Sequence, residues 1–187
     1  MSILAHHLTY DHLQQLREAR DELLELIDGE LLVTPSPSPR HQFLSQRLYD
    51  QIKPAIINAE LGWVLLAPLD VFFADGTILQ PDVIVILSER EDQIGEATSE
   101  GPPNLVMEIL SLSTSTSDHG RKRDNYARYA VPEYWIIDPF AQSVTILSGP
   151  DEGRYRNERH ARLTATSDTL PQISVDLELL FAPTPGR

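Results

Sequence analysis

The chain has 187 residues, of which 41% are hydrophobic and 23% charged, a composition that fits one globular domain over residues 1–187 with a single sizeable core. Its net charge of −13 argues against avid, non-specific binding to nucleic acid, because such binding requires Lys and Arg to neutralise phosphates. The sequence has no cysteine, which excludes disulfides, thiolate zinc sites and a cysteine nucleophile.

The first predicted elements are a helix and a hairpin. The N-terminal residues contain neither a basic segment nor a long apolar run, so we expect no signal peptide, no membrane span and a cytoplasmic protein. Leucines among scattered charges indicate an amphipathic helix over residues 9–19. The Asp28-Gly29 pair between two apolar runs predicts a tight β-hairpin, with Glu30 in the turn or first in the return strand.

A second helix and several strands follow. Ser38-Pro39 has the pattern of an N-cap and a first helical residue, which predicts a helix over residues 39–60 that Pro54 kinks or divides. The VIVIL segment is apolar on both faces, so its strand must lie inside a covered sheet. The strands expected here cover residues 63–67, 69–74, 79–87 and 105–110, with a polar loop or short helical insert at 88–100.

The last third of the chain is predicted to add one more helix and further strands. The STSTSD segment is typical of a helix N-terminus and predicts a helix over residues 117–130, which Pro132 ends. Strands are expected at 134–138, 144–147 and around Tyr155, with turns at 149–150 and 151–153 and a short apolar element at 173–181. The element order predicts an α/β fold with a mixed central β-sheet flanked by helices, plus the N-terminal helix and β-hairpin. Because the sequence has neither GxGxxG nor a P-loop, a doubly wound nucleotide-binding fold is excluded.

Glu108 is an ionisable residue inside an otherwise apolar strand. A buried carboxylate is costly unless a cation or hydrogen-bond donors replace its water. Lys122 on the following helix is one candidate partner, and a metal shared with Asp82 is another if their two strands are neighbours. Two close carboxylates repel unless a cation bridges them, and oxygen ligands suit Mg²⁺ or Mn²⁺. The alternatives are an ion pair with arginine for Glu108 and a local turn bond for Asp82.

One face of the helix after this strand carries three polar side chains. Asp118, Lys122 and Tyr126 are spaced at i, i+4 and i+8, so they lie over successive turns. If that face points toward Glu108, the ammonium could orient a water molecule or stabilise charge on a phosphorus atom. The alternative is that Lys122 is an exposed cation on a basic helix.

Four motifs occur in a fixed order along the chain: Pro81-Asp82, PNLVMEILS at 103–111, DxxxKxxxY at 118–126 and VPEYWIIDP at 131–139. With ELIDGE at 25–30, they resemble the bacterial family of restriction-endonuclease-like domains within the PD-(D/E)XK nuclease superfamily. The resemblance covers nearly the whole chain, and the ordered combination is more specific than any one motif.

The resemblance implies a restriction-endonuclease-like core and a metal-dependent endonuclease that hydrolyses phosphodiester bonds, with DNA as the expected substrate. Asp82 and Glu108 would be catalytic residues that bind Mg²⁺ or Mn²⁺, and Glu30 would be an accessory catalytic acid. The lysine that the family's motif places two residues after the glutamate is replaced here by Leu110. Lys122 would take over its role from the following helix.

Several other residues are candidate substrate or supporting groups, each with a simpler alternative. His41, in the first turn of its helix, could contact substrate or could be a surface or capping residue. Ser111 could support the site, although a backbone bond at the end of its strand is the alternative. Asp118 and Tyr126 are further candidates, with core packing as the alternative for the tyrosine. For Glu30 the alternative is turn chemistry.

The expected partners are nucleic acid and a second copy of the chain. DNA would contact a local basic face around Tyr155, for which a solvated hairpin face is the alternative. A homodimer is expected, with Tyr134 and Trp135 as candidate interface residues and core packing as the alternative. A function of another class is a binding or regulatory module that keeps the nuclease fold without turnover, which the net acidity favours. The basic face would comprise Arg154, Arg156, Arg159 and Arg162.

Overall fold

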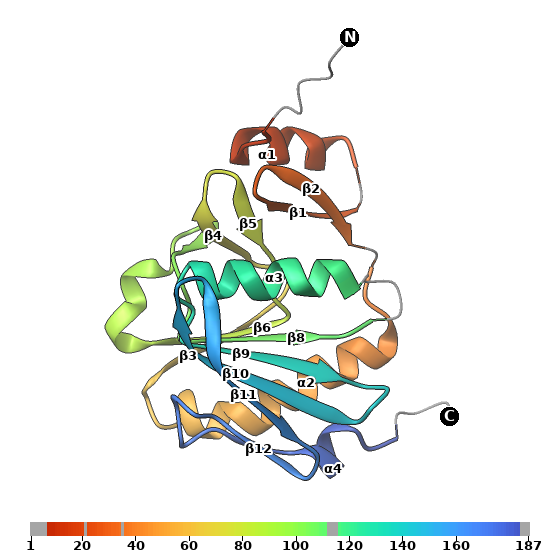
Figure 1. Ribbon diagram of the computed structural model, residues 1–187, viewed down its shortest axis with the longest axis vertical. Coiled ribbons are helices and arrows are strands. Elements are labelled where there is room, and N and C mark those ends of the chain that lie inside the picture. Colours follow the sequence, from red (N-terminus) through yellow and green to blue (C-terminus); the bar gives the residue numbers. More distant parts are fainter. Residues whose placement is uncertain (1–6, 21, 35, 112–115, 184–187) are drawn as a thin grey trace.

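A larger, mixed β-sheet forms the centre of the protein (Figure 1). The computed structural model describes residues 7–20, 22–34, 36–111 and 116–183, although the side chains of residues 116–119 fall outside this description. The strand order is β11-β10-β9-β8-β6-β3, and only β8 and β9 run parallel among these neighbours. The strands are β3 (Gly62–Leu66), β6 (Val83–Leu87), β8 (Leu105–Ile109), β9 (Glu133–Asp138), β10 (Ser143–Asp151) and β11 (Arg154–Ala161).

A smaller sheet with the order β2-β1-β5-β4-β7 lies beside it, toward the N-terminus (Figure 1). The predicted hairpin is confirmed, because Asp28 and Gly29 have φ values of 52° and 77°, as a tight two-residue turn requires, and Glu30 begins the return strand. The strands are β1 (Leu23–Ile27), β2 (Glu30–Thr34), β4 (Asp70–Ala74), β5 (Thr77–Leu79) and β7 (Thr98–Glu100), and a separate pair is formed by β12 (Thr164–Thr166) and β13 (Ser174–Asp176).

Two helices enclose the larger sheet. Helix α2 (Pro39–Ile56) covers one face, and α3 (Thr116–Arg128) lies between the opposite face and the smaller sheet (Figure 1). The apolar side chains of α2 recur at helical spacing and are buried, which explains why this segment is a helix. In the described part of the chain, no helix is long and apolar enough to cross a membrane. The remaining helices are α1 (Tyr10–Glu18), α4 (Leu177–Leu180) and the 3₁₀ helix η1 (Ser88–Gln93).

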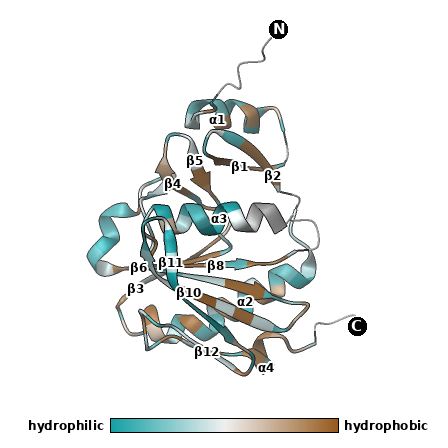
Figure 2. Cartoon of the chain, viewed as in Figure 1, coloured by the Kyte–Doolittle hydropathy of each residue, from teal (hydrophilic) through white to brown (hydrophobic). Residues whose placement is uncertain are grey.

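Strand β8 is buried along its whole length, whereas the edge strand β11 is largely hydrophilic (Figure 2). Met107 packs in the cluster under α2, and Val106 packs with Tyr126 of α3. Because successive side chains of a strand point to opposite faces, Glu108 points to the same side as Val106. The side chain therefore faces α3.

The structure differs from the predicted elements at several places. The strand expected at 79–87 is two strands, because residues 80–82 cross from β5 in the smaller sheet to β6 in the larger one. The turn expected at 149–150 is wrong, since β10 continues to Asp151. Helix α2 ends at Ile56 rather than near 60, and the polar insert contains both η1 and the unpredicted β7. Part of the expected helix N-terminus, residues 112–115, lies outside the described residues.

Candidate nuclease site

Asp82 and Glu108 come from neighbouring strands of the larger sheet. Strands β6 and β8 pair antiparallel with Val83 opposite Met107, so the next position along the register places Asp82 opposite Glu108. The Asp82 Oδ2 atom accepts a hydrogen bond from the backbone N–H of Ile109 at 2.7 Å. The two strands are therefore neighbours, which is the condition under which both carboxylates could lie on one side of the sheet.

Helix α3 brings two polar groups onto one oxygen of Glu108. The Lys122 Nζ atom lies 2.9 Å from Glu108 Oε1, and the Tyr126 hydroxyl donates to the same oxygen at 2.7 Å. The spacing of four residues places the Lys122 and Tyr126 side chains on the same face of α3, which packs against β8. Only 7% of the Lys122 side chain is exposed, so the alternative of a solvent-exposed helix cation is wrong.

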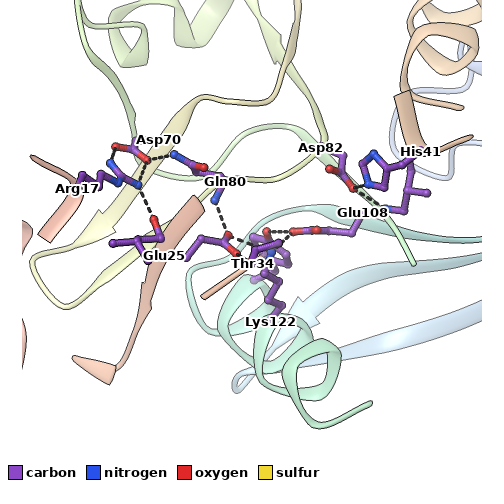
Figure 3. A network of polar contacts seen from close by, with 12 residues as sticks. Arg17, Glu25, Thr34, His41, Asp70, Gln80, Asp82, Glu108 and Lys122 are labelled. Atoms are coloured by element: carbon purple, nitrogen blue, oxygen red, sulfur yellow. Dashed lines mark hydrogen bonds and ion pairs between the residues drawn. The ribbon is translucent and has the colours of Figure 1, made fainter. Parts of the chain in front are cut away.

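Glu25 of β1 is a third member of this buried cluster, and it was not predicted. Its Oε1 atom lies 3.0 Å from Lys122 Nζ and accepts from the backbone N–H of Gln80 at 2.6 Å. Its Oε2 atom accepts from the Thr34 hydroxyl at 3.2 Å. Lys122 thus lies between two carboxylates, one from each sheet (Figure 3).

The polar contacts continue beyond Glu25 toward the N-terminal helix (Figure 3). The Gln80 side chain donates to Asp70 at 2.8 Å, and Arg17 of α1 makes a two-pronged ion pair with the same carboxylate. Arg17 also donates to the carbonyl of Leu24, the residue before Glu25. These contacts hold β1 in place behind the site.

His41 is the second partner of Asp82. The Nε2 atom lies 3.1 Å from Asp82 Oδ2, and the backbone N–H of His41 donates to the Ser38 hydroxyl, which caps α2. The other ring nitrogen, Nδ1, is buried and has no hydrogen-bond partner within the described residues. Burial lowers the pKa of His41, but the hydrogen bond and the negative charge of Asp82 raise it by more. The pKa of His41 therefore lies above that of a free histidine.

The cluster around Lys122 carries an excess of negative charge. Burial raises the pKa of Glu108 to about 7, although the Lys122 ammonium opposes this change. Burial lowers the pKa of Lys122, but the charges of Glu108 and Glu25 raise it well above its usual range. One ammonium therefore faces two carboxylates, and Asp82 adds a further acid at the next position on the sheet.

The remaining predicted residues either lie apart from this cluster or have side chains outside the described part of the chain. Glu30 does not contact Lys122: its side chain is 74% exposed and pairs with Arg121 at 3.0 Å. Asp118 lies in α3, but its side chain is not among those described. Ser111 follows β8 and is half-buried, so its role stays a prediction.

Two surfaces were predicted to contact partners, one for a second copy of the chain and one for DNA. Tyr134 and Trp135 are fully buried in the core, so the predicted interface at these residues is wrong and the homodimer stays a prediction without a defined surface. The four arginines around Tyr155 are exposed, but Arg156 pairs with Asp151 and Arg159 with Asp168. A basic face for DNA therefore also stays a prediction.

Comparison with known proteins places the chain in a family. The family model described as "Putative restriction endonuclease" matches residues 9–179. The chain belongs to this restriction endonuclease family. The membership confirms the resemblance read from the motifs, and it supports a nuclease function.

Solved structures support the fold of this family. Five solved chains match, among them a protein from Anabaena variabilis ATCC 29413 described as "a putative nuclease". It is 20% identical, with a TM-score of 0.78, and the match covers 94% of this chain and 98% of that one. At this identity the likeness shows the fold alone, which confirms the predicted α/β architecture. No protein with curated annotation matches the chain.

The oxygen atoms of the site fit the divalent cation that the restriction endonuclease family implies. Asp82 uses Oδ2 and Glu108 uses Oε1 in the contacts above, which leaves one oxygen of each carboxylate without a hydrogen bond from the described residues. No three His, Asp or Glu side chains of the described residues are arranged to hold a metal ion. Mg²⁺ is commonly bound by one or two carboxylates with water and substrate phosphate completing its shell, so two acids suffice.

Proposed function

We propose that the protein is a divalent-metal-dependent endonuclease that hydrolyses phosphodiester bonds in DNA. The observation that carries this proposal is the position of Lys122, whose ammonium lies 2.9 Å from Glu108 although Leu110 occupies the expected lysine position on the strand. A binding or regulatory module without turnover was the alternative, and it would be favoured by a lysine that pointed away from the acids. Lys122 points toward them.

In this proposal the two strand acids hold the metal and the helix supplies the fixed charge. Asp82 and Glu108 would bind Mg²⁺ or Mn²⁺, which would polarise a phosphoryl oxygen and lower the pKa of a bound water. Lys122, held on its other side by Glu25, keeps an ammonium in place to orient water or to stabilise charge on the phosphorane. Because this charge is fixed before substrate binds, no reorganisation is needed as charge develops.

The supporting residues orient the two acids. The Tyr126 hydroxyl and Lys122 fix one oxygen of Glu108, and His41 and the Ile109 amide fix one oxygen of Asp82. In each carboxylate the other oxygen is the one that would face the metal. Second partners of this kind hold metal ligands in a single orientation.

A cleavage assay tests the proposed reaction. Purified protein is incubated with plasmid, single-stranded DNA and RNA in the presence of Mn²⁺ or Mg²⁺. We expect DNA to be cut with either ion and cutting to stop when EDTA is added. Failure to cut any substrate would contradict the proposal, and cutting that survives Glu108→Ala would contradict the assigned site.

Substitution of each of two acids in the β1–β2 hairpin tests which one assists the site. Glu25→Gln is expected to lower the rate of DNA cleavage by about 10–100-fold, the usual effect of removing a group that orients the catalytic shell. Glu30→Gln removes only an exposed pair with Arg121, so its rate should stay within about twofold of wild type. Initial rates at saturating Mn²⁺ provide the comparison. Equal losses in the two variants would show that contact with Lys122 is not what matters.

A further inference from the structure

Phe140 is an exposed aromatic ring on the turn between β9 and β10. Its side chain is 54% exposed, whereas Tyr134 and Trp135 of the preceding strand are fully buried. The turn is held by Asp138, whose Oδ1 atom accepts from the backbone N–H groups of Phe140 and Ala141 at 2.8 and 2.9 Å. The ring is therefore presented to solvent from a fixed turn.

Arg40 lies over this ring and carries a charge that no described acid neutralises. Its guanidinium carbon is 5.5 Å from the centre of the Phe140 ring, and its Nη2 atom donates to the carbonyl of Pro139 at 2.5 Å. By contrast, Arg121 and Arg123 of α3 each pair with a glutamate. A guanidinium has five N–H donors, so most of those on Arg40 remain for a ligand.

The Arg40–Phe140 pair lies at the same end of the sheet as the acids. Strands β8 and β9 run parallel with Glu108 opposite Ile136, and Phe140 follows the carboxyl end of β9. Arg40 directly precedes His41, the partner of Asp82. The residue that follows Arg40 in the sequence is thus part of the candidate site.

We propose that Arg40 and Phe140 form a subsite for an unpaired nucleotide next to the scissile phosphodiester. The Phe140 ring would stack on the base, and the Arg40 guanidinium would contact a neighbouring phosphate. A base inside a duplex is already stacked on both sides, so the subsite favours single-stranded DNA over duplex. This inference rests on the proposed nuclease function and names the form of its substrate.

Binding to the inactive variant Glu108→Gln tests the subsite without requiring cleavage. A fluorescein-labelled single-stranded oligothymidylate and a duplex of equal length are each titrated with this variant, without added metal because Glu108→Gln lacks the charge that would hold one. Adding Phe140→Ala should weaken single-strand binding by about tenfold, because the variant lacks the aromatic ring on which one base would stack. Duplex binding should change by less than about twofold. Leu163→Ala removes another exposed apolar side chain, one that is 83% exposed, and should leave both affinities unchanged.

A tryptophan at the same position supplies a direct signal of stacking. Phe140→Trp should retain the affinity of the parent, and its added fluorescence should be quenched by the single strand more than by the duplex. Equal single-strand affinities for the parent and Phe140→Ala would overturn the subsite while leaving the proposed nuclease intact. Loss of single-strand binding in Phe140→Ala, in a protein whose wild type cuts no DNA, would support the subsite and contradict the nuclease. A parent that binds neither oligonucleotide would overturn both.

Discussion

Lys122→Met is expected to lower the free energy of unfolding by about 3 kcal/mol or more. The substitution leaves Glu25 and Glu108 facing each other without a cation, both almost fully buried. Breaking a buried ion pair by removing one partner costs about 3–5 kcal/mol, because an uncompensated charge remains. Proton uptake by Glu108 relieves part of this cost, so we expect the lower end of the range at neutral pH.

Arg123→Met is the matched control on the same helix. Arg123 pairs with Glu158 at 3.0 Å, but their side chains are 39% and 42% exposed. Exposed pairs contribute less than about 1 kcal/mol, so this variant should unfold close to wild type. Urea unfolding followed by circular dichroism measures both changes. Similar midpoints for the two variants would contradict a buried, charge-compensating role for Lys122.

Glu108→Gln is expected to abolish cleavage while leaving the protein folded. The amide oxygen of glutamine can still accept the hydrogen bonds of Lys122 and Tyr126, and Lys122 keeps Glu25 as its counter-ion. The charge that would hold the metal is lost, so we expect the cleavage rate to fall by at least ~100-fold, as when one preorganised charge-stabilising group is removed. Rates with Mn²⁺ and the melting temperature are measured on the same preparation. A variant that cuts DNA at the wild-type rate would contradict the assignment.

The pH dependence of stability tests whether Glu108 ionises in the folded protein, because glutamine has a similar shape but no ionisable group. Burial raises the pKa of this carboxyl from 4.5 to about 7 in the folded protein. A raised pKa in the folded state adds stability at low pH, and this stability is lost as pH rises from about 4.5 through 7. Glutamine does not ionise, so Glu108→Gln should gain stability relative to wild type between pH 5 and pH 8. Urea unfolding at the two pH values tests the sign, and a relative loss at pH 8 would contradict it.

The acids of the larger sheet could be predicted because each stands out against an apolar strand. Glu108 interrupts LVMEI, and Asp82 directly precedes VIVIL, so both were conspicuous before any fold was known. The same reasoning applied to LLELI would have found Glu25, which is 2% exposed in β1. Glu30 was expected from the family resemblance instead, and its side chain is exposed and paired with Arg121. For an acid in contact with Lys122, the cost of burying a charge was the better guide.

Other features depend on contacts that lie far apart in sequence. The segment at 79–87 carries one continuous apolar pattern except at Gln80-Pro81-Asp82, and only the pairing of β5 and β6 with different sheets shows that the chain crosses there. Glycine and proline at 149–150 suggested a turn, yet pairing of Pro150 and Asp151 with β11 extends the strand past Gly149. Trp135 looked like an interface residue because aromatic rings suit interfaces and cores equally well.

A Mn²⁺-soaked crystal measured for anomalous scattering tests the central claim most directly. We expect a single strong anomalous peak in contact with the carboxylates of Asp82 and Glu108, on the oxygen atoms that do not bond His41 or Lys122. The Glu108→Gln crystal, soaked in the same way, should lose the peak while keeping the positions of Lys122 and Tyr126. A wild-type crystal of a DNA-cutting preparation with no peak at these two acids, or with its peak elsewhere, would contradict the account.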